Sequence, residues 1–327
     1  VNEPERLSEE NARSSRFEPP FNLNDTGVVA DSRYFDVEVT YAKASPDEIH
    51  IRITASNRGP EPAAVHLLPT LWFRNTWSWG DDTPRPELAA VAPPPDAAWA
   101  IEARHAELGS VYLYGRQEGT LLFTENDSNA RRLWGDAGAS PYAKDSFHRR
   151  ICDGETAAVN PAGRGTKCAS WHQAIVPQGQ SIRLDLVLAM RPLAAPFARS
   201  EAVFAARRGE ADAFFSELLP DASAEDHRIL RQALAGMIFS KQFFHYDVDR
   251  WLKGDTVPAP AERSRRRNAQ WKHMKSYDVI SMPDAWEYPW FAAWDLSFHA
   301  SAFALIDVDF AKDQIELMVS ERYLHPN

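Results

Sequence analysis

The feature that most constrains the fold of this chain is a change in the spacing of its apolar residues near Pro196. Between residues 34 and 191, short runs in which apolar and polar residues alternate are separated by turns rich in proline and glycine. Alternation with a period of two predicts half-buried antiparallel strands. Because no helical pattern interrupts these strands, we expect a β-sandwich domain over residues 1–195.

The first two predicted strands show the alternation most clearly. In the first, Val37 and Val39 alternate with polar residues, and in the second, Ile51 and Ile53 alternate with His50 and its polar neighbours. We therefore expect the valines and isoleucines to face the core and His50 to lie on the polar face.

Beyond Pro196 the apolar spacing becomes that of a helix, which predicts a linker helix over residues 196–222. Ser223, followed by two acidic residues, predicts the start of a second helix. Further helices are expected after Trp294 and near Asp307 or Asp309. Residues 223–327 thus hold too few predicted helices for a complete helical domain, and we expect apolar faces that include Leu230, Leu234 and Ile315 to lack partners.

Charge and composition exclude several classes of function. The net charge of −10 argues against a nucleic acid partner, and the basic run at residues 263–267 is interpreted as a solvated loop. No apolar stretch approaches the roughly 18 residues of a membrane span. Cys152 and Cys168 lack the spacing of a zinc site. Residues 245–249, with carboxylate and imidazole groups in a row, are interpreted as a polar helix end, so we expect neither a metal nor a cofactor.

Because no stretch is long enough to span a membrane, we expect a soluble protein. No charged and then apolar leader opens the sequence, and we expect a cytoplasmic location. The chain begins with Val1 instead of methionine, which leaves room for residues upstream.

Aromatic and acidic residues are crowded together between Trp286 and His299. A sugar ring presents an apolar face that aromatic rings cover, and it carries hydroxyl groups whose protons a carboxylate accepts. If Trp294 opens a helix, Asp295 and His299 lie one turn apart on one face, with Trp294 and Phe298 on the neighbouring ridge. The alternative is that the rings fill a core and Asp295 caps the helix.

The segment Trp294-Asp295-Leu296-Ser297-Phe298-His299 is similar to the W-D-x-x-F-H signature of glycoside hydrolase family 63. Tyr288 and Trp290 match the aromatic positions that precede this signature in bacterial members, and residues 66–80 and 240–251 also look like the long bacterial members. The resemblance implies a β-sandwich followed by an (α/α)6 barrel, of which this chain would hold only the first helices. We therefore expect a fragment of a longer, bacterial protein.

The resemblance also implies inverting hydrolysis of α-glucosides or related small glycosides and oligosaccharides by an aspartic acid and a glutamate base. Both groups come late in the family's barrel, so no catalytic residue is expected within this chain. Asp295 is the fallback candidate for a catalytic acid. Ala292 stands where the mannosylglycerate type has an acidic residue, so a charged glycerate ligand is not specifically indicated.

The sequence therefore predicts a carbohydrate substrate held by a wall of binding residues. The predicted wall consists of Tyr288, Trp290, Trp294 and Asp295, with Glu287 and His299 as secondary members. Two alternatives stay open. One is an inverting phosphorylase of similar architecture, which would require phosphate, and the other is a carbohydrate-binding protein without catalysis.

Overall fold

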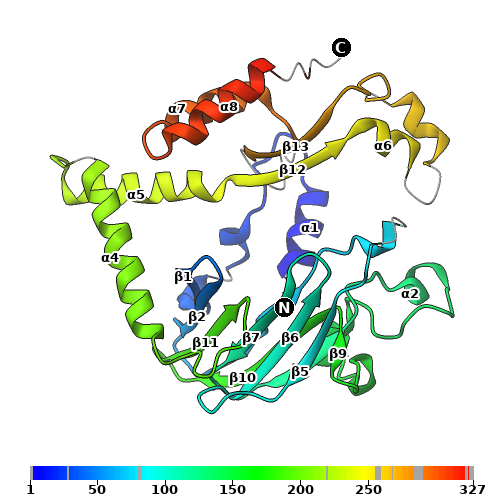
Figure 1. The fold of residues 1–327 in the computed structure, drawn as a ribbon, viewed down its shortest axis with the longest axis vertical. Helices are drawn as coiled ribbons and strands as arrows, with labels where there is room; N and C mark the ends of the chain where they lie inside the picture. The colour runs from blue at the N-terminus through cyan, green and yellow to red at the C-terminus, as the bar shows by residue number, and fades with distance from the viewer. Residues whose placement is uncertain are drawn as a thin grey trace. The chain divides into compact units, whose positions relative to one another are not determined.

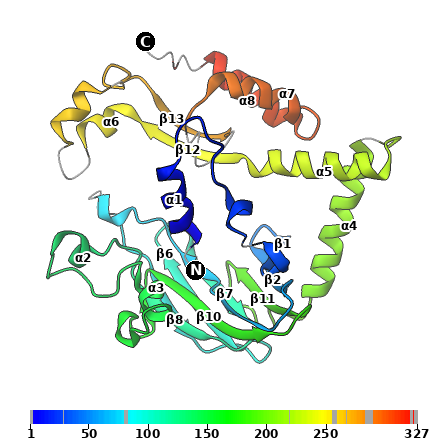
Figure 2. The same cartoon turned by 180° about the vertical axis from the view of Figure 1, so that it is seen from behind.

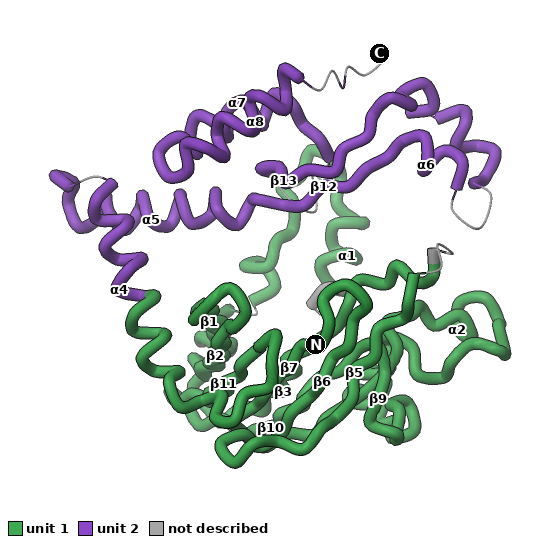
Figure 3. Tube along the Cα trace, in the orientation of Figure 1, with its two compact units in different colours: residues 1–78, 82–207 green, residues 79–81, 208–327 purple. Residues whose placement is uncertain are grey.

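A computed structural model describes residues 3–27, 29–79, 83–218, 220–254, 259–266, 268–282, 290–320 and 323 of the chain. These residues form a large antiparallel β region followed by a mainly helical region, which confirms the predicted combination of β and α structure (Figures 1 and 2). The chain divides into two compact units (Figure 3). The first comprises Val1–Ser78 and Asp82–Arg207, and the second comprises Trp79–Asp81 and Arg208–Asn327.

The first unit contains two antiparallel sheets. The larger has seven strands in the order β1 (Phe35–Ser45), β2 (Glu48–Asn57), β11 (Ser181–Ala189), β7 (Gly109–Gly115), β6 (Trp99–His105), β5 (Glu87–Val91) and β9 (Arg164–Gly165). In the smaller sheet, β10 (Lys167–Val176) pairs with β3 (Ala63–Leu67), β4 (Thr70–Trp72) and β8 (Thr120–Thr124). Three short helices complete the unit, namely α1 (Glu3–Arg13), α2 (Ala130–Trp134) and α3 (Ser146–Ile151).

Side chains from both sheets meet in one hydrophobic core, as the alternating pattern predicted. Leu88, Ile101 and Leu113 come from the larger sheet, and Phe123 and Cys168 come from the smaller sheet. All five are 5% exposed or less, so this core is closed to water. Burial of the apolar surface in this core is the main stabilising contribution to the unit.

The outer face of the larger sheet is also covered, so His50 lies on the expected face but is not exposed to water. His50 is completely buried although it lies on the face opposite the core. The residues after β11 run across this face, where Phe197 joins a cluster with Tyr114 and Val187. Phe204 packs edge-on against His50, with the ring centroids 6.3 Å apart. A local pattern could not indicate this cover, because it comes from a distant segment.

The apolar face of β1 shows the opposite deviation. Val37 is 53% exposed and Val39 is 44% exposed, although both were expected to face the core. β1 is an edge strand that pairs only with β2, and the facing sheet has four strands against seven. The smaller sheet therefore leaves this edge of the larger one uncovered.

The described residues of the second unit form helices and one β-hairpin. Its helices are α5 (Ala224–Phe239), α6 (Val248–Lys253), α7 (Ala293–Phe303) and α8 (Val308–Ser320), and α4 (Ser200–Leu218) continues into it from the first unit. Ser223 caps α5 as predicted, because its Oγ accepts a hydrogen bond from the backbone N–H of Asp226 at 3.1 Å. The described helices do not by themselves test the (α/α)6 barrel, which stays a prediction.

The hairpin corrects one sequence interpretation. Residues 245–249 were interpreted as a helix end, but they belong to the end of β12 (Lys241–Asp247) and the start of α6. β12 pairs with β13 (Lys275–Ser281) in antiparallel register. The alternating pattern Phe243-Phe244-His245-Tyr246 fits a strand better than a helix, because it places two rings on each face of the ribbon.

No helix among the described residues is long and apolar enough to cross a lipid bilayer.

Candidate functional site

Three cavities stand out in the described parts of the chain. The largest, of about 940 Å³, lies within the second unit and is lined mainly by aromatic side chains. The other two, of about 560 Å³ and 530 Å³, lie in the first unit and have largely polar and charged linings. A large apolar cavity with a few convergent polar groups is the arrangement typical of small-molecule sites, so we describe the largest cavity as the candidate site.

The β-hairpin forms one side of this cavity. Alternation along β12 directs Phe244 and Tyr246 into the cavity, whereas Phe243 and His245 contact Tyr277 on the other face of the ribbon. This geometry places a row of aromatic rings along the strand.

A short helix turns the chain directly after this strand. The Oδ1 atom of Asp247 accepts a hydrogen bond from the backbone N–H of Arg250 at 3.0 Å and so caps α6. Trp251, on α6, lines the cavity with its ring centroid 6.5 Å from that of Tyr246. The cap therefore fixes the start of α6 and, with it, the position from which the Trp251 side chain projects.

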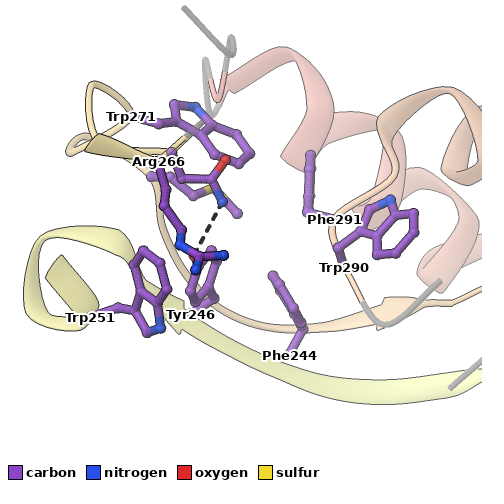
Figure 4. Close-up of a pocket in the computed structure, with 9 residues that line it drawn as sticks. Phe244, Tyr246, Trp251, Arg266, Trp271, Trp290 and Phe291 are labelled. Atoms are coloured by element: carbon purple, nitrogen blue, oxygen red, sulfur yellow. Dashed lines mark hydrogen bonds between the residues drawn. The ribbon is translucent and has the colours of Figure 1, made fainter. Parts of the chain in front are cut away.

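Two further segments complete the lining (Figure 4). Arg266, Asn268, Trp271 and Met274 come from the connection before β13, and Trp290 and Phe291 come from the residues before α7. Met274 is completely buried and Phe244 is 9% exposed, and both also belong to the core of the second unit. The cavity floor is thus part of the packed core, which holds the lining side chains in place.

The polar groups of the cavity are few. The Nδ2 atom of Asn268 donates to the Oη atom of Tyr246 at 3.4 Å, as the dashed line in Figure 4 marks. Arg266 is exposed and is the only charged residue among the nine that line the cavity in the described part of the chain. Since none of these nine residues carries a carboxylate or an imidazole, this lining can bind a ligand but holds no pair of groups for general acid and base catalysis.

The structure places the predicted wall residues in different surroundings. Trp290 is 48% exposed and lines the cavity. Trp294 is 72% exposed and is not among the lining residues. Its ring meets that of Phe298 edge-on at 6.1 Å, as their helical spacing predicted.

Asp295 lies in the first turn of α7 and is partly buried. The N-cap of α7 is Ala292, and no side chain of a described residue caps this helix. The carboxylate of Asp295 has no hydrogen bond or ion pair with any described residue. The alternative role of Asp295 as a helix cap is therefore not supported.

His299 is held by a chain of hydroxyl groups. Its Nδ1 atom lies 2.6 Å from the Oγ atom of Ser281, which in turn lies 2.9 Å from the Oγ atom of Ser240. These contacts tie α7 to the residue before β12 and to the last residue of β13, which lie together at one end of the hairpin, and this is a structural role. Glu287 and Tyr288 lie outside the described residues.

Several lining residues were missed by sequence reasoning. Tyr246, Trp251, Trp271 and Asn268 were not predicted, although the aromatic alternation of β12 was a signal for the first of them. Arg266 belongs to the basic run that was interpreted as a solvated loop. It is exposed, as expected, but its guanidinium also borders the cavity.

Comparisons with known proteins add one relative. No family model matches this sequence. The chain is 34% identical over 337 aligned residues to YMR196W, an uncharacterized protein of Saccharomyces cerevisiae. The match covers 91% of this chain but only 31% of the yeast protein. This relative is eukaryotic, so the comparison does not support the expected bacterial origin.

Proposed function

We propose that the chain supplies a carbohydrate-binding site of an inverting glycoside hydrolase that resembles family 63 and acts on α-glucosides or related small glycosides. The observation that carries this proposal is the cavity of about 940 Å³ lined by three tryptophans, namely Trp251, Trp271 and Trp290. The W-D-x-x-F-H segment that suggested the family begins four residues after Trp290.

The chemistry of the lining suits a sugar. Aromatic rings cover the C–H face of a pyranose, and tryptophan and tyrosine rings each offer a large rigid contact surface. The Asn268 amide, the Tyr246 hydroxyl and the Arg266 guanidinium add hydrogen-bonding groups for ring and glycosidic oxygens. Few polar groups on an aromatic surface fix the orientation of a ligand without the cost of burying many charges.

Under this proposal, the acid and the base come from elsewhere. The family resemblance places an aspartic acid and a glutamate beyond Asn327, in later helices of an (α/α)6 barrel. The lack of a carboxylate among the described lining residues is consistent with that division. The chain also spans only 31% of the length of its yeast relative. We therefore expect this chain alone to bind glycosides without hydrolysing them.

Isothermal titration of the chain with methyl α-glucoside and a panel of α-linked glucose disaccharides tests the proposal. Binding of at least one of these sugars is expected, and Trp290→Ala should weaken it roughly tenfold, the larger end of what one aromatic contact contributes. Trp134→Ala is the matched control, because Trp134 is 72% exposed and lies in the first unit. Absence of binding to every sugar, or equal losses in both variants, would overturn the proposal.

Because none of the nine described lining residues carries a carboxylate, we keep one second candidate, a carbohydrate-binding protein that lacks catalysis. The two functions differ in the longer protein, since the hydrolase releases glucose from a bound glycoside and the binding protein does not. An assay of glucose release with and without inorganic phosphate also separates hydrolysis from phosphorolysis.

A further inference from the structure

Trp251 is held in the cavity by a residue that does not line it. The guanidinium carbon of Arg263 lies 4.9 Å from the centroid of the Trp251 ring, and its Nη1 atom donates to the Trp251 carbonyl at 2.8 Å. Trp251 lines the cavity and Arg263 does not. Arg263 therefore contacts the indole without being one of the nine lining residues.

The hydrogen bond holds Arg263 to the backbone of Trp251, and the cation–π contact restrains the Trp251 ring. A guanidinium over an aromatic face is attracted by the negative charge of that face, and the hydrogen bond fixes the guanidinium relative to α6. Because both residues are partly buried, water screens this arrangement less than it would on an open surface. Trp251 is thus already ordered before a ligand binds, so less side-chain entropy is lost on binding.

The cavity has room for more than one sugar ring. Its volume of about 940 Å³ lies near the upper end of the roughly 300–1,000 Å³ that small-molecule sites span. Trp251 and Trp290 lie on opposite sides of the cluster of lining residues (Figure 4). One pyranose that stacks on Trp290 leaves the Trp251 side of the cavity open.

We propose that Trp251 is a second sugar-binding platform that selects ligands with at least two sugar rings, and that Arg263 is the residue that positions it. This inference rests on the proposed carbohydrate function and extends it. Trp290 contacts the first ring and Trp251 contacts the next one, so a disaccharide uses both platforms and a monosaccharide uses one.

The test compares one-ring and two-ring probes on the 327-residue chain by titration calorimetry. The probes are methyl α-glucoside and the tightest-binding member of a set comprising trehalose, kojibiose, nigerose, maltose and isomaltose. The disaccharide should bind roughly fivefold to tenfold more tightly than methyl α-glucoside, which is the contribution of one added aromatic contact. Trp251→Ala should remove this preference by weakening the disaccharide far more than methyl α-glucoside, whereas Trp290→Ala should weaken both probes.

Arg263→Met tests the positioning role. It should reduce the disaccharide preference about threefold or more without affecting methyl α-glucoside, because the indole is less constrained. Arg265→Met is the matched control, since Arg265 lies in the same short 3-10 helix, is exposed and makes no ion pair with a described residue. Trp251→Phe, with a smaller ring, should keep part of the preference. It replaces Trp251→Ala in the test if a thermal melt shows that Trp251→Ala is unstable.

The outcomes separate this inference from the function on which it rests. If no sugar binds the unmodified chain, the carbohydrate function itself fails. If methyl α-glucoside binds and the disaccharide binds no better, or if Trp251→Ala keeps the preference, the second platform alone is overturned. An equal loss in Arg263→Met and Arg265→Met removes the positioning role of Arg263.

Discussion

At the scale of single residues, Asp295 can be interpreted either as a sugar-binding carboxylate or as a helix cap, and these two roles predict opposite effects of its substitution. Among the described residues, no side chain makes a capping hydrogen bond at the start of α7, so the structure does not support a capping role for Asp295. In the longer protein proposed above, we expect Asp295→Ala to weaken sugar binding about a hundredfold or more, because a pair of charge-assisted hydrogen bonds is lost. The melting temperature should hardly change.

Titration of that variant with an α-glucoside, paired with a thermal melt, checks the prediction. Asp295→Asn is the matched variant, since it keeps the shape and removes the charge. An unchanged affinity with a lowered melting temperature would assign Asp295 a structural role instead.

A second residue-scale prediction concerns Glu48, whose carboxylate is buried on the outer face of the larger sheet. Its Oε1 atom lies 3.0 Å from the Nε2 atom of His50, and the Nη2 atom of Arg199 lies 2.8 Å from its Oε2 atom. Burial acts to raise the pKa of Glu48 and is the largest single influence, but the hydrogen bonds from Arg199 and His50 outweigh it and lower the pKa below its usual 4.5.

A lowered pKa in the folded state stabilises the fold above the unfolded pKa, and this stabilisation is lost as the pH falls through the folded value. Glu48→Gln should therefore reduce the free energy of unfolding by about 1–3 kcal/mol at neutral pH, with the difference shrinking below about pH 4. Urea unfolding across this pH range measures it. Glu107→Gln is the control, because Glu107 is exposed and its carboxylate makes no ion pair with a described residue. A difference that stays constant with pH would contradict the linkage.

At the scale of secondary structure elements, the cap of α5 is the feature most open to measurement. The Oγ atom of Ser223 accepts from the Asp226 N–H and also donates to the Asp226 carboxylate at 2.6 Å. Ser223→Ala should lower the free energy of unfolding by about 1 kcal/mol, whereas Ser223→Gly should cost only a few tenths. Urea unfolding followed by far-ultraviolet circular dichroism compares them. Equal effects of the two substitutions would show that the hydroxyl does not act as a cap.

At the scale of the whole molecule, exposed apolar side chains on the second unit predict self-association. Phe239 is 82% exposed, Val319 is 71% exposed and Ile315 is 51% exposed, as expected for Ile315. Leu234 is 4% exposed, so the expectation that it lacks partners was wrong. Apolar surface of this kind promotes contacts between copies.

Sedimentation velocity over a range of concentrations should show association that the double variant Phe239→Lys, Val319→Lys reduces. The control is Phe17→Lys, since Phe17 is 83% exposed and belongs to the first unit. Monomeric behaviour of the unmodified chain at high concentration would contradict the prediction of self-association.

The sequence by itself determined the features that depend on neighbours within one strand or one turn. The alternation between residues 34 and 191 predicted the strands of the first unit, and Ser223 predicted the start of α5. The pairing of Trp294 with Phe298 followed from helical spacing. These features were predictable because propensity, capping and side-chain direction are local properties.

The tertiary structure alone decided which residues meet across the chain. His50 is buried because a segment after β11 covers it, and Trp251 joins Trp290 because the hairpin and the residues before α7 pack on one core. Arg263 became relevant only through its contact with Trp251. Burial and cavity shape depend on packing between distant segments, and an alternating or helical pattern in one segment carries no information about what covers it.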